Sequence, residues 1–241
     1  MERRRNKGLF VNKIIRVILL KVELRNVYVI FEKGTELERI ALEDITLSFS
    51  TTERILLVGN TGSGKTTLIY LLDLLLKPSS GTILYDGTNP FENPYNFRKK
   101  FGVAFQIPER QFFNENVREE IVYAARNFST LYSEDSLKLL VRKVGLKESI
   151  LEKSPFRLSG GEQRKVAIAS ILIHKPEFLI FDEPTAGLDL KGVLSIRDIL
   201  KGFKDEKKGF LIATHEPEIF RDLCEREIRL EQGKIVSDKR I

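Results

Sequence analysis

The sequence predicts an α/β fold, with a mostly parallel sheet between helices and a helical lobe inserted into it. Two short runs are apolar at every position, Phe178 to Phe181 and Phe210 to Ala213. Such runs are typical of strands that are buried on both faces of a parallel sheet. Predicted strands and helices alternate along the chain, which places helices on both faces of that sheet. Between residues 115 and 151 the pattern changes, and apolar residues recur at helical spacing instead.

The first sixty residues contain three candidate strands, each rich in β-branched and aromatic residues. They run from Val22 to Phe31, from Ile40 to Phe49 and from Arg54 to Val58. The third strand leads directly into a glycine-rich loop. The loop and its two flanking elements therefore form a strand–loop–helix unit.

A buried helix is predicted after this loop, from Thr67 to Lys77, because the segment is apolar on nearly every face. Pro78 and Gly81 predict its end. A short strand from Thr82 to Tyr85 and a turn at Asp86-Gly87 follow.

The helical lobe is predicted from residues that repeat every three or four positions. Ser133, followed by Ser136 and an apolar run, resembles a helix start. The core resumes with a helix from Gly161 to His174. The apolar residues of the lobe are Val117, Ile121, Ala124, Leu137, Leu140 and Val144.

Composition limits the classes of function. The net charge is +6 and much of the excess lies near the start of the chain, so residues 1–20 are interpreted as a basic N-terminal extension. A solvated tail and a contact with an anionic membrane surface both explain this charge. We expect no nucleic-acid partner, because no aromatic-plus-basic binding motif accompanies the charge. The single cysteine, Cys224, excludes an intrachain disulfide and fits a reducing compartment.

No stretch approaches the ~20 apolar residues that a membrane-spanning helix needs. The apolar segment from Ile14 to Leu20 is short, and Arg16 interrupts it. It lacks a small-residue cleavage site, so we expect no signal peptide. A membrane role would therefore depend on partners.

The glycine-rich loop from Gly59 to Thr66 has the pattern of a P-loop and is the strongest functional motif. Glycines let the backbone fold around phosphates with its N–H groups pointing inward, and the next helix presents its positive end to the same anions. Lys65 is predicted to reach the β- and γ-phosphates, and the Thr66 hydroxyl to coordinate Mg²⁺. The predicted nucleotide-binding residues of the loop are Gly59, Asn60, Thr61, Gly62, Ser63, Gly64, Lys65, Thr66 and Thr67.

A carboxylate pair, Asp182 and Glu183, ends the apolar run that begins at Phe178. Ligands collect at this end of the strands in open α/β sheets. We expect Asp182 to hold Mg²⁺ and Glu183 to polarise an attacking water. Taken alone, an ordinary acidic turn after a strand explains the pair equally well.

A second helix start that could bind an anion lies at Leu158 to Gln163. Alone it could be a polar turn with Ser159 as the helix cap. A chain with two phosphate-binding helix starts suggests that one of them serves the nucleotide of a neighbouring chain.

These motifs together resemble those of the ABC (ATP-binding cassette) ATPases. Leu158 to Gln163 resembles the family's signature motif, and Gln106 its Q-loop glutamine. Ala186 to Asp189 resembles the D-loop, and Thr214-His215 the switch histidine. The resemblance covers residues 21–236.

The resemblance implies an ATPase domain at residues 21–241, with a P-loop NTPase core, an N-terminal antiparallel β part and a helical subdomain inserted at about residues 107–160. It also implies a head-to-tail dimer of two cassettes that trap ATP. Each nucleotide then contacts one chain's P-loop and the Ser159, Gly160 and Gly161 of the other. Lys65, Glu183 and His215 would be catalytic, and Thr66, Gln106 and Asp182 would hold Mg²⁺.

An aromatic residue and the second histidine have expected roles as well. The adenine is expected to stack on Phe31, with Tyr28 as the alternative. His174 lies at a helix end before Pro176, where exposure or a contact with the helix dipole is expected instead of a functional role.

Further stretches are similar to the energy-coupling factor subfamily, which drives micronutrient uptake. These stretches are Glu32 to Glu38, Phe105 to Phe113 and Asn127-Phe128. The similarity implies a second ATPase subunit, either a paralogue or a second copy, a transmembrane coupling protein and small substrate-binding membrane proteins. It places the chain at the cytoplasmic face of the membrane as a peripheral subunit. Phe112 and Phe113 either line a groove for the coupling protein or pack in the lobe.

Other classes of function stay open or are excluded. The ATPase of another ABC importer or exporter class is the alternative. A DNA-repair ATPase with a long coiled coil does not fit, because Lys65 and Ser159 lie too close in sequence. A zinc-bearing repair ATPase would need cysteine clusters, and one cysteine cannot form them.

Overall fold

The computed structural model describes residues 19–106 and 112–241. Most of the basic N-terminal extension, residues 1–18, and most of the Q-loop stretch, residues 107–111, lie outside the described residues. Gln106 itself is described. Within these two ranges no helix is both long and apolar enough to cross a membrane.

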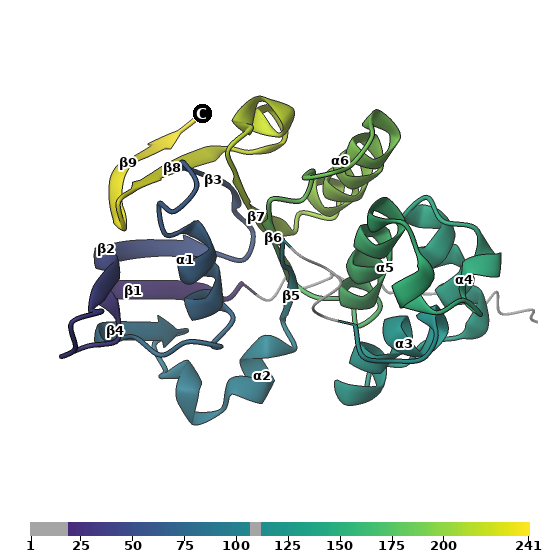
Figure 1. Cartoon of the computed structure of the whole chain (residues 1–241), viewed down its shortest axis with the longest axis horizontal. Helices are drawn as coiled ribbons and strands as arrows, with labels where there is room; N and C mark the ends of the chain where they lie inside the picture. Colours follow the sequence, from purple (N-terminus) through teal and green to yellow (C-terminus); the bar gives the residue numbers. More distant parts are fainter. Residues whose placement is uncertain (1–18, 107–111) are drawn as a thin grey trace, which may run out of the picture.

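The described chain forms an α/β fold with two sheets, as the sequence predicts (Figure 1). The smaller sheet is antiparallel, with the order β2-β1-β4, and it is the expected N-terminal β part. The larger sheet has the order β5-β6-β7-β3-β8-β9 and is parallel except for β9. The strands are β1 (Lys21–Phe31), β2 (Arg39–Ser50), β3 (Arg54–Val58), β4 (Ser80–Tyr85), β5 (Phe101–Ala104), β6 (Phe178–Asp182), β7 (Gly209–Thr214), β8 (Arg226–Glu231) and β9 (Lys234–Arg240).

The central strands are apolar throughout because each of their faces contacts a different core. In β3, Ile55 and Leu57 face the core beside the antiparallel sheet, whereas Leu56 and Val58 face the core beside the helical lobe. Successive residues of a strand point to opposite faces, so both sets must be apolar. Figure 1 shows strands β5, β6 and β7 between the antiparallel sheet and the helical lobe.

The strand order brings three functional segments to one edge of the sheet. Strand β3 pairs in parallel with β7, and β7 pairs in parallel with β6. The C-terminal ends of these strands therefore lie side by side. The P-loop follows β3, the carboxylate pair ends β6, and His215 follows β7.

Helices α3, α4 and α5 pack together at one end of the molecule, away from the antiparallel sheet (Figure 1). Ser133 and Ser136 form a capping box at the start of α4, which confirms the predicted helix start. The helices are α1 (Lys65–Leu72), α2 (Pro94–Arg98), α3 (Val117–Asn127), α4 (Glu134–Lys143), α5 (Gly160–Leu172) and α6 (Leu190–Asp205). Short 3₁₀ turns occupy Pro90–Glu92, Glu148–Ile150, Pro155–Arg157, Pro217–Ile219 and Arg221–Leu223.

Helix α1 is shorter than the sequence predicts. It ends at Leu72, and Leu74 has a left-handed backbone with φ of 57°. The Arg98 guanidinium binds the carbonyl oxygens of Asp73 (Nε–O 3.0 Å) and Leu74 (Nη2–O 2.7 Å). An outside donor thus satisfies carbonyls that a continuing helix would have paired internally. The apolar run beyond Leu72 packs as a turn.

His174 is buried, so the expectation of an exposed histidine is wrong. Its side chain packs against Phe128, with 4.9 Å between ring centroids, and Nε2 lies 3.2 Å from the carbonyl oxygen of Phe101. Burial lowers the pKa of His174. The helix α5 ends two residues earlier, and the next residues turn back into the core.

Candidate functional site

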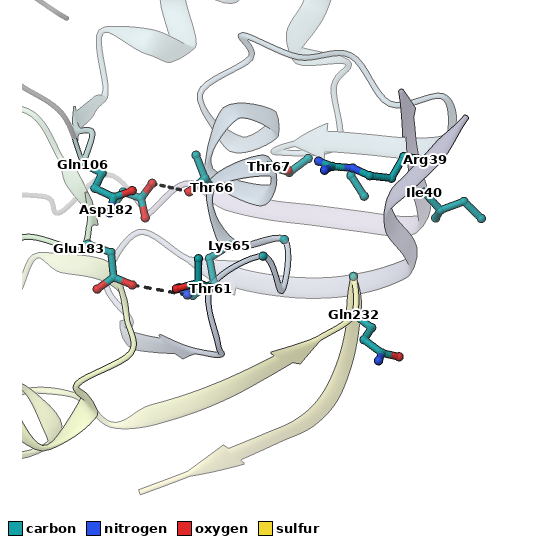
Figure 2. Close-up of a pocket in the computed structure, with 14 residues that line it drawn as sticks. Arg39, Ile40, Thr61, Lys65, Thr66, Thr67, Gln106, Asp182, Glu183 and Gln232 are labelled. Carbon is teal, nitrogen blue, oxygen red and sulfur yellow. Dashed lines mark hydrogen bonds and ion pairs between the residues drawn. The ribbon is translucent and has the colours of Figure 1, made fainter. Parts of the chain in front are cut away.

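The P-loop forms one wall of a cavity of about 390 Å³ at the C-terminal edge of the sheet (Figure 2). The opposite wall holds the carboxylate pair and Gln106. The start of β2 and the β8–β9 turn complete the rim. The lining residues are Arg39, Ile40, Ala41, Thr61, Gly62, Gly64, Lys65, Thr66, Thr67, Gln106, Asp182, Glu183, Gln232 and Gly233.

Two glycines of the P-loop are required by its backbone. Gly64 has a φ of 106°, and a Cβ there would lie 2.9 Å from the carbonyl oxygen of Ala41. A Cβ on Gly59 would lie 2.3 Å from the carbonyl oxygen of Leu230. The loop is therefore pressed against β2 and β8, and only glycine fits at both positions.

Lys65 begins α1 and is buried under the P-loop. Its Nζ donates to the carbonyl oxygens of Gly59 (2.6 Å) and Asn60 (3.2 Å). It also lies 3.5 Å from Oε1 of Glu183. The loop's own carbonyls and one carboxylate thus hold the ammonium group at the edge of the cavity.

Thr66 and Asp182 meet across the cavity. The Thr66 hydroxyl donates to Oδ2 of Asp182 at 2.7 Å, and Figure 2 shows the two side chains facing each other. Asp182 is almost fully buried, its Oδ1 has no hydrogen-bond partner within the described residues, and burial raises its pKa. Hydroxyl and carboxylate oxygens suit Mg²⁺, which commonly binds one or two carboxylates together with phosphate oxygens. The pair therefore fits a magnesium site.

Glu183 lies between Lys65 and His215. Its Oε2 is 2.8 Å from Nδ1 of His215 and accepts from the His215 backbone N–H at 3.3 Å. The residue has a left-handed backbone, with φ of 49°. This geometry turns the carboxylate away from the buried strand and toward the cavity, which it lines.

Ser159, Gly160 and Gly161 lie apart from this cavity and line none of it. Ser159 caps α5 through a capping box with Glu162, so its predicted role as a helix cap is confirmed. Apart from its two chain neighbours and the backbone of its own helix, no atom of the described residues lies within 4 Å of the position that a Cβ on Gly160 would take. The start of α5 is thus open to a ligand from outside the chain.

Three aromatic predictions have different outcomes. Phe31 is partly buried and does not line the cavity. The guanidinium of Arg39, a residue that does line the cavity, lies over the Phe31 ring at 5.8 Å from its centroid. Phe112 is buried in the core of the lobe. Phe113 is 60% exposed and packs edge-to-face on Tyr123.

Several residues of this site were not predicted from the sequence. Arg164, on α5, donates from Nη1 to the carbonyl oxygen of Glu183 and from Nη2 to that of Gln106, at 2.6 Å each. Arg39, Ile40, Gln232 and Gly233 reach the cavity from strand ends far away in sequence. No local motif marks these residues, because only the tertiary fold brings them to the P-loop.

Comparisons with known proteins agree with this geometry. Residues 42–186 match the ABC transporter family. The energy-coupling factor transporter ATP-binding protein EcfA2 of Thermotoga maritima is 42% identical over 91% of this chain and 82% of its own length. The EcfA2 of Ligilactobacillus salivarius is 38% identical over 91% of this chain and 78% of its own.

Solved structures show the same fold. A dimeric ATP-binding cassette bound to ADP and Pi has a TM-score of 0.81 at 26% identity, covering 91% of this chain and 98% of its own. CbiO1 from Clostridium perfringens, part of the ABC transporter complex CbiONQ, has a TM-score of 0.74 at 29% identity, covering 91% of this chain and 88% of its own. The chain belongs to the ABC transporter family of ATPases, among the ATP-binding proteins of energy-coupling factor transporters.

Proposed function

We propose that this chain binds and hydrolyses ATP to power the uptake of a micronutrient, a vitamin or a metal ion, in an energy-coupling factor complex. One observation carries the hydrolysis: Lys65 and Glu183 line the P-loop cavity, and Glu183 connects Lys65 to His215. A cation that can bind phosphate and a carboxylate that can bind water therefore lie at the cavity, and an imidazole contacts the carboxylate. The similarity to two energy-coupling factor ATP-binding proteins supports the uptake role.

The chain's own residues supply the parts that phosphoryl transfer needs. The P-loop amides and Lys65 bind the β- and γ-phosphates and hold the γ-phosphorus in place. Glu183 accepts a hydrogen bond from a water molecule and thereby orients that water for attack on the γ-phosphorus. His215, held by Glu183 through Nδ1, contacts the γ-phosphate. Catalysis then depends on position and charge stabilisation.

Magnesium belongs to this proposal as the metal that accompanies ATP. Thr66 and Asp182 would hold it, and Gln106 lines the same cavity. When bound, Mg²⁺ neutralises charge on the phosphate oxygens. The hydrogen bond between Thr66 and Asp182 keeps both oxygens at the cavity wall.

The second nucleotide contact comes from a partner chain in a head-to-tail dimer. The start of α5 is open and lies outside the cavity, which supports a role for Ser159, Gly160 and Gly161 at the nucleotide of the other subunit. The solved cassette with TM-score 0.81 is itself a dimer. The partner is a second copy or a paralogue.

The complex includes a transmembrane coupling protein and small substrate-binding membrane proteins, and the chain lies at the cytoplasmic face of the membrane as a peripheral subunit. The identity to two EcfA2 proteins over most of their length supports this arrangement. Phe113, exposed beside Tyr123, is available to a partner, whereas Phe112 belongs to the core. The alternative is the ATPase of another importer or exporter class.

Purification from native membranes in mild detergent, with mass spectrometry of what accompanies the chain, tests the assembly. A second cassette ATPase, one larger coupling protein and several small membrane proteins support the proposal. Two ordinary permease subunits would instead support the alternative. ATP hydrolysis by the purified complex, with a Lys65→Met variant as the control, tests the chemistry separately.

A further inference from the structure

A single arginine connects helix α5 to two segments of the candidate site. Arg164 lies five residues after Ser159, which caps α5. Its Nη1 donates to the carbonyl oxygen of Glu183 and its Nη2 to the carbonyl oxygen of Gln106, both at 2.6 Å. Arg164 does not line the nucleotide cavity, but its positive charge partly offsets the rise in the pKa of Asp182 that burial causes, and its two hydrogen bonds hold the backbone beside the cavity.

The two carbonyls are neighbours because of the strand register. Strands β5 and β6 are parallel, and the last pair between them joins Ala104 to Phe181. Gln106 and Glu183 each lie two residues beyond that pair. Beyond the last hydrogen-bonded pair of β5 and β6, the planar guanidinium supplies two donors in a fixed fork and bridges the two segments that follow these strands. Lysine, with a single nitrogen, has no such fork.

The contact on Glu183 fixes an unusual backbone. Glu183 has a φ of 49°, a strained conformation for a non-glycine residue that persists only where the surroundings hold it. Its N–H donates to the carbonyl oxygen of Ala213 at 2.9 Å, and its carbonyl accepts from Arg164. Both peptide groups of Glu183 are therefore held, the N–H by β7 and the carbonyl by α5 together with the Ala186 N–H at 3.3 Å.

The direction in which the Glu183 carboxylate points follows from this backbone conformation. With the backbone in this left-handed turn, the side chain reaches both Lys65 and His215. An error of about 1 Å in the position of a catalytic group can cost on the order of 100-fold in rate. Loss of the Arg164 contact would leave the Glu183 carbonyl with the longer bond from the Ala186 N–H, at 3.3 Å, as its remaining restraint.

We propose that Arg164 is a positioning residue that couples the start of helix α5 to Glu183 and Gln106. The inference rests on the proposed ATPase function and deepens it. Arg164 holds the Glu183 carboxylate where it can orient the attacking water. It also transmits movement of the Ser159 end of α5 to Glu183 and Gln106 together.

The kinetic test compares Arg164→Met with Arg164→Lys in the assembled complex. We expect Arg164→Met to lower kcat about 10- to 100-fold while KM for ATP changes less than about threefold, because the P-loop is untouched. Arg164→Lys should restore part of the loss. Lys165→Met is the matched control on the same helix, where Nζ donates to the carbonyl oxygen of Gly145 at 3.4 Å, outside the site. It should keep wild-type kinetics.

A double variant tests whether Arg164 acts through Glu183. In a Glu183→Gln background, Arg164→Met should lower the residual rate less than about fivefold, because the carboxylate that it positions is gone and only its contact with Gln106 is left to lose. A further 10-fold loss there would overturn the inference. A wild-type kcat in Arg164→Met would overturn it as well, and so would a parallel change in kcat, KM and melting temperature, which indicates general destabilisation.

Hydrogen exchange provides a readout that does not need hydrolysis. Amides of residues 183–188 should exchange faster in Arg164→Met and Arg164→Lys than in wild type, while strand β3 exchanges at an unchanged rate. Unchanged exchange at residues 183–188 would overturn the inference. Wild type that hydrolyses no ATP would contradict the proposed function, and the exchange result would still decide whether Arg164 holds this segment.

Discussion

Glu183 and His215 are joined twice: Oε2 of Glu183 lies 2.8 Å from Nδ1 of the imidazole and 3.3 Å from the His215 backbone nitrogen. The other carboxylate oxygen lies 3.5 Å from Nζ of Lys65. One side chain therefore connects the segments that follow β3, β6 and β7. A change in its position changes the geometry of the whole phosphate-facing edge.

Glu183→Gln should abolish most hydrolysis and leave ATP binding intact. The amide still fits the space but cannot act as a base toward water, so we expect kcat to fall at least about 100-fold. ATP should then trap a dimer, measured by light scattering after gel filtration. Glu216→Gln, at an exposed position next to His215, is the control and should turn over normally. Near-wild-type turnover in Glu183→Gln would contradict the assignment.

Ser159→Arg should impair hydrolysis at the nucleotide of the partner chain. The substitution puts a long side chain at the open start of α5 and removes the cap on its N-terminus. In a mixed dimer with one Ser159→Arg chain and one Lys65→Met chain, the two lesions meet at one nucleotide and leave the other site intact. We expect about half of the wild-type rate. A rate near zero would contradict head-to-tail pairing.

Asp182→Asn should raise the magnesium requirement of hydrolysis. The substitution removes the buried carboxylate whose Oδ2 accepts from Thr66 and whose Oδ1 has no partner within the described residues. We expect the Mg²⁺ concentration for half-maximal rate to rise about 10-fold or more. Magnesium titration at fixed ATP measures it. An unchanged titration would assign the metal to other groups, whereas chelation of all Mg²⁺ should stop the wild-type enzyme.

The part of the fold around the P-loop could be predicted from the sequence because local signals determine it. Strand β3 runs from Arg54 to Val58 as predicted, since apolar residues and the glycine-rich loop define its two ends. The capping serines at 133 and 159 also act locally, on the first turn of their own helices. In these segments, short-range chemistry and tertiary packing favour the same structure.

The features that could not be predicted are contacts between residues that are distant in sequence. The end of α1 depends on Arg98, whose donors reach the carbonyls of Asp73 and Leu74 across two elements. The bridging role of Arg164 depends on the register of β5 and β6, which no local pattern encodes. His174 is buried because Phe101 and Phe128 lie around it. Periodicity and motif spacing carry no information about such partners.

Phe31→Ala should weaken ATP binding about 2- to 10-fold, as expected for loss of an aromatic contact worth ~0.5–1.5 kcal/mol. In the structure the Arg39 guanidinium lies over the Phe31 ring, and Arg39 lines the cavity. We expect Arg39→Ala to have an effect of similar size and Phe31→Tyr to have almost none. Calorimetry with ATP and with inorganic tripolyphosphate separates base from phosphate contacts. An equal loss for both ligands in Phe31→Ala would contradict adenine stacking.

The carboxyl of Asp73 should make stability depend on pH. Burial at the end of α1 raises its pKa to about 7, against about 3.9 in an unfolded chain. Between these values the folded protein holds a proton that the unfolded chain has lost, so this carboxyl makes stability fall as pH rises from about 4 to about 7. Asp73→Asn removes this dependence, and the variant should exceed wild type by on the order of 2 kcal/mol at pH 7.5 but not at pH 4. Urea unfolding at both pH values measures it, with Asp205→Asn as the exposed control. An advantage of Asp73→Asn that is equal at both pH values would arise from packing and not from ionisation.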